Sequence, residues 1–117
     1  MIKTYTITIP LPFEQSFELI SKSGDDIISW GKSNSDEKNG YIDWKQSFWS
    51  LTGNTLIMVK LKRVQEDETV ATVTVHKPMQ VIDPLGICKK VFNKLVRAIR
   101  TTIASSDTYK DIVITVE

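Results

Sequence analysis

The sequence contains little from which a catalytic centre or a metal site could be built. It has one cysteine, Cys88, and one histidine, His76, among 117 residues. A single cysteine excludes an internal disulfide bond and any zinc site built on several cysteines. Neither charge sign dominates, because 15 Lys and Arg stand against 14 Asp and Glu, for a net charge of +1. This balance argues against a strongly basic nucleic-acid-binding protein and against an acidic disordered tail.

Long apolar runs are also missing. No run approaches the ~18–20 residues needed to cross a membrane. The first ten residues alternate threonine and isoleucine and lack the long apolar stretch of a secretory signal peptide. The length of 117 residues and an apolar content of 41% suit one domain with its own core. We therefore expect a single soluble, cytoplasmic domain over residues 1–117, with no membrane span.

Alternation of apolar and polar residues predicts most of the strands. In residues 2–9, Tyr5, Ile7 and Ile9 alternate with threonines, which is the pattern of a half-buried strand. Further strands are predicted at 27–32, 41–49, 55–64, 69–77 and 110–117. Residues 33–40 are polar and end in Asn39-Gly40, a strong turn signal. The four successive strands between residues 27 and 77 have short connections, which indicates an antiparallel meander.

Two helices are predicted from apolar residues spaced three and four apart. The first starts at Pro12, a favourable first helical residue, and is expected to close at Gly24 in a left-handed conformation. The second runs from Asp83, an acidic N-cap followed by proline, to about Ala104. The apolar side of this long helix consists of Leu85, Cys88, Val91, Phe92, Leu95, Val96, Ile99 and Ile103. Cys88 lies on this side and is expected to be a small buried apolar residue.

These elements follow the order β-α-β-β-β-β-α-β, and the fold class is α+β. The economical arrangement is one antiparallel meander sheet packed against the long C-terminal helix. Residues Leu56 to Val59 are apolar at every position. The strand 55–64 is therefore expected either to be central and covered on both faces, or to present its second face to a ligand or partner.

Aromatic residues cluster in the predicted strands. All three tryptophans lie within twenty residues, and both faces of the strand 41–49 carry large rings. One interpretation is core packing, and the other is a pocket between the sheet and the long helix. Stacking on single-stranded nucleic acid is less favoured, because the strands lack interleaved Arg and Lys. The predicted ligand-binding residues are Trp30, Trp44, Phe48, Met58, Phe92, Leu95 and Val96.

The polar side of the long helix is basic. It carries Lys89, Lys90, Lys94, Arg97 and Arg100. A solvated helix face is the ordinary interpretation. The alternative is a site for an anionic partner, such as a membrane surface, nucleic acid or an acidic protein.

No catalytic group can be assembled from these residues. A catalytic histidine needs an orienting carboxylate and usually a nucleophile, and no pattern in the sequence supplies them to His76. We therefore expect a protein that is not an enzyme, with no catalytic residue, no metal site and no cofactor.

The order of features resembles small bacterial proteins of the START/Bet v 1-like superfamily, the SRPBCC group of polyketide cyclases and lipid-transport proteins. The residues that carry the resemblance are Tyr5-x-Ile7-x-Ile9, Phe13, Phe17, Trp30, Gly40-x-Ile42, Thr69-Val70-x-Thr72-Val73 and the long helix from Asp83. The resemblance implies a curved antiparallel sheet around the last helix, sometimes with an apolar cavity between them, and binding of hydrophobic small molecules. The chain departs from the group in being short and in adding a strand at 110–117.

Two functions follow from these observations. The first is a non-enzymatic domain that binds an apolar small molecule between the sheet and the long helix. The alternative is a protein-interaction module or homodimer that pairs through a sheet edge, such as 111–117, or through the apolar face of the strand 55–64. Nucleic acid is not favoured as a partner.

Overall fold

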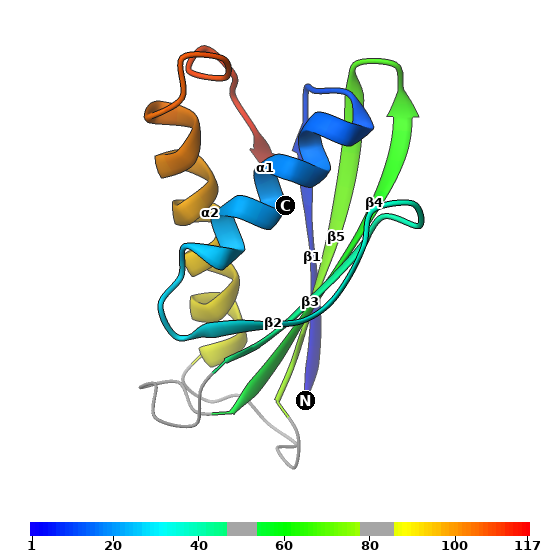
Figure 1. The fold of residues 1–117 in the computed structure, drawn as a ribbon. Coiled ribbons are helices and arrows are strands. Elements are labelled where there is room, and N and C mark those ends of the chain that lie inside the picture. The colour runs from blue at the N-terminus through cyan, green and yellow to red at the C-terminus, as the bar shows by residue number, and fades with distance from the viewer. Residues whose placement is uncertain (47–53, 78–85) are drawn as a thin grey trace.

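A computed structural model describes residues 1–46, 54–77 and 86–117. In this part of the chain, an antiparallel sheet carries two helices on one of its faces (Figure 1). The elements in chain order are β1 (Ile2–Ile9), α1 (Phe13–Asp25), β2 (Trp30–Asp36), β3 (Tyr41–Gln46), β4 (Thr55–Gln65), β5 (Glu68–His76), α2 (Ile87–Ala104) and β6 (Thr115–Val116). The predicted α+β class and the predicted order of elements are confirmed.

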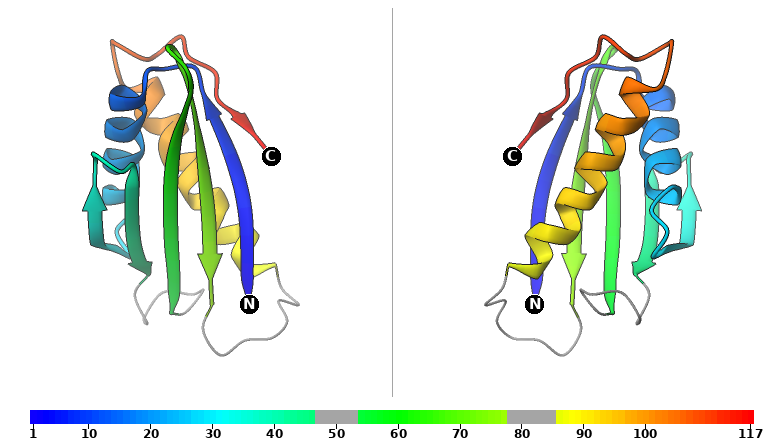
Figure 2. Two further views of the ribbon diagram at one scale, coloured as in Figure 1. Left: turned by 90° about the vertical axis from the view of Figure 1, so that its right-hand side faces the viewer. Right: turned by 90° about the vertical axis from the view of Figure 1, so that its left-hand side faces the viewer.

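The sheet has the strand order β2-β3-β4-β5-β1-β6. Strands β2 to β5 form the predicted meander. β1 then joins the far side of β5, with Ile2 opposite His76 and Ile9 opposite Thr69. α2 crosses the concave face of this sheet, while the opposite face carries neither helix (Figure 2). We call that opposite side the helix-free face. None of the helices in the described ranges is long and apolar enough to cross a membrane.

The core lies between the sheet and the two helices. Ile7 and Ile9 of β1 point into it and are fully buried, as the alternation predicts. The ring of Tyr5 stacks on Phe92 of α2, with 4.4 Å between the ring centroids. Apart from Leu85, which lies outside the described residues, every predicted member of the apolar side of α2 is buried, Cys88 included.

The start of α2 differs from the prediction. The helix begins at Ile87, and its N-cap is Gly86 in a left-handed conformation, with φ 62°. Asp83 and Pro84, the predicted start, lie outside the described residues.

The predicted role of Gly24 is wrong. Gly24 lies inside α1, which continues to Asp25 and has Asp26, in a right-handed conformation, as its C-cap. A Cβ atom added to Gly24 would lie 2.6 Å from Cη2 of Trp44. The glycine therefore allows close packing of α1 on β3 and does not end the helix.

The edge strands also differ from their predicted bounds. β2 starts at Trp30 and continues through polar residues to Asp36, because backbone pairing with β3 extends a segment whose own pattern reads as a turn. The turn is shorter than predicted, although Gly40 has the expected positive φ of 67°. The last strand, predicted over 110–117, contains only Thr115 and Val116.

Candidate functional site

The predicted ligand-binding residues separate into two groups. Trp30, Trp44, Phe92, Leu95 and Val96 join one core cluster between the sheet and α2, and each is at most 5% exposed. Met58 does not join them, and its assignment to the same site is wrong. In β4, Ile57 and Val59 point into the core, so Met58 between them lies on the helix-free face. Phe48 lies outside the described residues.

The two described tryptophans are held in place by hydrogen bonds. Trp30 Nε1 donates to Oε1 of Gln46 at 2.9 Å, and Trp44 Nε1 donates to Oδ1 of Asp25 at 3.0 Å. Their rings lie 5.6 Å apart, tilted by 42°. Both indole N–H groups are therefore satisfied, as buried tryptophans require.

Lys94 extends from α2 toward the same place. Its Nζ donates to Oε1 of Gln46 at 3.2 Å, so this one oxygen accepts hydrogen bonds from both Trp30 and Lys94. Gln46 is fully buried and Lys94 is half-buried. We call Trp30, Gln46 and Lys94 the Gln46 cluster. It places an amide and an ammonium group against the aromatic part of the core.

The sequence analysis did not select Gln46. Ile42, Trp44 and Gln46 occupy successive inward positions of β3. A polar residue at the third inward position of an otherwise apolar face was the signal that could have identified it.

The other members of the predicted basic face behave differently. Lys90, Arg97 and Arg100 are exposed, as expected for a solvated helix face. Nζ of Lys89 lies 5.0 Å from the ring centroid of Tyr5 and 5.4 Å from that of Phe92, which is within reach of a cation–π contact. The basic face is therefore not uniform, and Lys94 is the member directed toward the core.

A groove runs beside Lys94, between α2 and the residues that follow α1. Its lining consists of Asp26, Ile27, Lys94, Arg97, Ala98, Thr101 and Thr102, and its volume is about 280 Å³. We call it the Lys94 groove. Its walls combine apolar side chains with two cationic ones.

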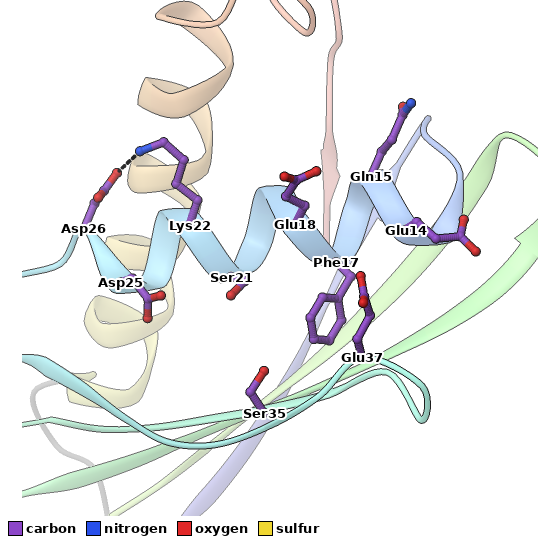
Figure 3. A pocket seen from close by; sticks show the side chains of 10 residues that line it. All are labelled: Glu14, Gln15, Phe17, Glu18, Ser21, Lys22, Asp25, Asp26, Ser35 and Glu37. Atoms are coloured by element: carbon purple, nitrogen blue, oxygen red, sulfur yellow. Dashed lines mark hydrogen bonds and ion pairs between the residues drawn. The ribbon is translucent and has the colours of Figure 1, made fainter.

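A second, larger groove lies between α1 and the end of β2 (Figure 3). It has a volume of about 760 Å³, and five of its lining residues are acidic: Glu14, Glu18, Asp25, Asp26 and Glu37. Lys22 pairs with Asp26 at 3.1 Å, Lys32 with Asp25 at 3.0 Å and Arg63 with Glu14 at 3.3 Å. Lysine and arginine side chains of this chain thus form ion pairs with three of the five carboxylates. We therefore interpret this groove as an ordinary solvated surface.

The sequence left open whether the strand 55–64 is covered on both faces, and the structure shows that the helices cover only one (Figure 2). β4 is central, between β3 and β5, and neither α1 nor α2 covers its second side. Tyr41, Met58, Thr72 and Thr74 line a shallow hollow of about 440 Å³ there. Beside Met58, Oδ1 of Asp43 is buried without a hydrogen-bond partner among the described residues. Desolvation raises the pKa of this carboxyl above its ordinary value of 3.8.

His76 lies half-buried at the end of β5, opposite Ile2 and Leu56. In the ranges that the structure describes, no three His, Cys, Asp or Glu side chains gather where they could hold a metal ion.

Comparison with known proteins gives the fold. No family model and no curated protein sequence matches the chain. Among solved structures, an HSP90 activator from Plasmodium falciparum aligns with a TM-score of 0.60 and 13% identity, covering 98% of this chain and 99% of that one. Ara h 8.0201 aligns with a TM-score of 0.58 and 15% identity, covering 91% of this chain and 100% of that one. The ZhuI aromatase/cyclase from Streptomyces sp. R1128 aligns with a TM-score of 0.51 and 9% identity, covering 87% of each chain.

These three proteins have SRPBCC-type folds, and Ara h 8 is a member of the Bet v 1 family. The chain therefore has the START/Bet v 1-like fold, and the predicted resemblance is confirmed. At these identities the likeness establishes the fold alone.

Proposed function

We propose that this protein is a non-enzymatic binding domain that takes a small apolar molecule between the sheet and α2. The Gln46 cluster is the observation that supports this most. Ligand sites are mostly apolar and contain a few polar groups at fixed positions. Here Gln46 and Lys94 are the polar groups, and Trp30 and Trp44 belong to the apolar surroundings. Gln46 satisfies the buried indole of Trp30, so it has a structural role. Half-burying the ammonium group of Lys94 beside a neutral partner opposes folding, which favours a functional role for Lys94.

Side chains must move for the ligand to enter. Trp44, Phe92 and Leu95 are fully buried and fill the described part of this layer. Trp30 and Lys94 are placed to move, because Trp30 begins an edge strand and Lys94 is half-buried beside a groove. The ligand then replaces their contacts with its own apolar surface.

The shared fold does not choose between kinds of partner. One protein of this fold is an aromatase/cyclase and another is an HSP90 activator. The argument for a small molecule in this chain therefore comes from its own residues at the Gln46 cluster.

Native mass spectrometry of the protein purified directly from cells tests this proposal. We expect a discrete adduct that is lost on denaturation. In parallel, apolar probes should raise the melting temperature and change the tryptophan fluorescence. Trp30→Ala removes the ring that must move aside and should change the affinity for the probe, whereas Met58→Ala, a control on the helix-free face, should leave it unchanged. An adduct-free mass with no response to any apolar probe would contradict the proposal.

A second candidate function is self-association through the edge of β1. β6 pairs only with Ile7 and Thr8, so among the described residues the Ile2–Thr4 end of β1 lies at the edge of the sheet (Figure 2). Ile2 is 60% exposed there. An open strand edge can pair with a second chain.

Sedimentation velocity over a range of protein concentrations tests this second candidate. A dimer that Ile2→Lys converts to a monomer would support edge pairing, because a charge on the edge opposes strand addition. A monomer at every concentration would exclude self-association.

A further inference from the structure

We infer that the small molecule carries an anionic group, a carboxylate, which Lys94 and Arg97 hold in the Lys94 groove. This inference rests on the proposed function and adds the chemical class of the ligand. It follows from the position and partners of one ammonium group.

Lys94 is a half-buried cation with a neutral partner. Its Nζ donates to the amide oxygen of Gln46 at 3.2 Å. None of the three ion pairs in the described part of the chain includes Lys94, so no carboxylate there lies within 4.0 Å of its Nζ. Moving an ammonium group out of water is costly unless an opposite charge accompanies it. A bound anion would supply that charge.

The groove around Lys94 suits a carboxylate with an apolar body. Arg97 stands three residues after Lys94, which places the two side chains on neighbouring positions of the helix surface. A guanidinium group offers paired donors that match the two oxygens of a carboxylate. Ile27 and Ala98 supply apolar wall beside the two cations, in a groove of about 280 Å³.

One acidic residue, Asp26, also lines the groove, and its charge must be considered. Its Oδ2 is paired with Nζ of Lys22 at 3.1 Å. No ion pair in the described part of the chain joins Asp26 to Lys94 or Arg97. Both cations are therefore available to a ligand.

The groove is connected to the aromatic layer through Gln46. The oxygen that accepts from Lys94 also accepts from the indole of Trp30. An anion that draws the ammonium group away from Gln46 therefore changes the surroundings of Trp30. Tryptophan fluorescence should report this event.

Octanoate and octan-1-ol are the probes that test the inference, because they share an alkyl chain and differ in the charge of the head group. Both are titrated into the full chain at neutral pH by isothermal calorimetry. We expect octanoate to bind about tenfold to a hundredfold more tightly than the alcohol, because a charge-assisted hydrogen bond contributes an affinity gain of about this size. Lys94→Met retains most of the apolar stem and should remove this difference, whereas the control Lys90→Met, on an exposed position of the same helix, should preserve it.

The outcomes separate this inference from the proposed function. If both probes bind wild type equally, or if Lys94→Met binds octanoate as wild type does, the anion inference is overturned and the apolar site stands. If neither probe binds, the proposed function fails and the inference fails with it. Should Lys94→Met not fold, Arg97→Gln decides, because Arg97 is exposed. A selective loss of octanoate binding supports the inference, and unchanged binding overturns it.

Discussion

At the scale of single residues, contacts between distant parts of the chain determine what several side chains do. Trp44 donates its indole hydrogen to Asp25 and packs against Gly24, both on α1. Neither contact could be predicted from the local sequence, because the partners are 19 and 20 positions away. The same holds for Lys94, which the helical pattern places on a solvated face and which the structure directs toward Gln46.

Gly24→Ala should destabilise the protein. The added Cβ would overlap the indole of Trp44, which is fully buried and cannot easily retreat. Overpacking of this kind costs about 1–3 kcal/mol, more than the ~0.5–1 kcal/mol that alanine gains over glycine in a helix. Chemical denaturation measures the change. Gly31→Ala is the control, since its nearest neighbouring atom lies 4.0 Å from the added Cβ, and equal effects of the two variants would contradict the explanation.

Asp43→Asn should stabilise the protein at neutral pH. Desolvation raises the pKa of Asp43 above 3.8, so the folded protein holds this proton more tightly than the unfolded chain does. The ionised carboxylate therefore opposes folding at a pH above its folded-state pKa. This penalty fades as the pH falls and is gone well below pH 3.8, where both states are protonated.

Unfolding of wild type and Asp43→Asn by urea, at neutral pH and well below pH 3.8, measures this effect. The free energy of unfolding should differ between the two proteins only at neutral pH. Glu66→Gln is the control, because Glu66 is exposed in a turn and should matter little at either pH. A gain that persists in acid would show that charge is not its cause.

At the scale of elements, the spacing of apolar residues predicted the buried side correctly where one element packs on another over its whole length. The apolar side of α2 is a helical pattern, and its described members all pack on the sheet. The alternation in β1 similarly places its inward residues. Residues 56–59 of β4 are apolar at every position, so the pattern did not show which of them face the core, and Met58 was grouped with the tryptophans. The edge strands were less predictable, because pairing with a neighbour sets their lengths.

Phe92→Ala should test how much the docking of α2 contributes to stability. Phe92 is fully buried and stacks on Tyr5 of β1. Its truncation should lower the free energy of unfolding by about 3–5 kcal/mol, through lost burial and the cavity that remains. Lys90→Ala, on an exposed position of the same helix, should change it by less than about 0.5 kcal/mol. A small effect of Phe92→Ala would mean that α2 is not held by its apolar side.

At the scale of the whole molecule, β1 ties the two ends of the chain together. This strand is the first in sequence and lies between β5 and β6 in the sheet. It also contacts α2, because Tyr5 stacks on Phe92. Backbone hydrogen bonds between Thr6 and Glu117, at 3.1 and 2.9 Å, continue the pairing beyond β6. β1 therefore links the first and last described strands within one sheet.

Unfolding should consequently be a single transition. Tryptophan fluorescence reports on the three tryptophans, of which Trp30 lies in β2 and Trp44 in β3, whereas far-ultraviolet circular dichroism reports on the whole chain. Because the core between the sheet and the helices is continuous, urea curves from the two probes should coincide. Two separated midpoints would show that the chain unfolds in parts and would contradict the prediction of a single domain.

The sequence alone determined the fold class, the order of elements, the meander and the apolar side of α2. These follow from periodicity, and periodicity is a local property that survives whenever one face of an element is buried. Tertiary structure decided the rest: the position of β1 beside β5, the short length of β6, the contact of Gly24 with Trp44 and the inward direction of Lys94. Each of these depends on which distant segment becomes the neighbour, and long-range pairing has no period in the sequence. The Gln46 cluster, on which the proposed function depends, belongs to this second group because its three residues come from β2, β3 and α2.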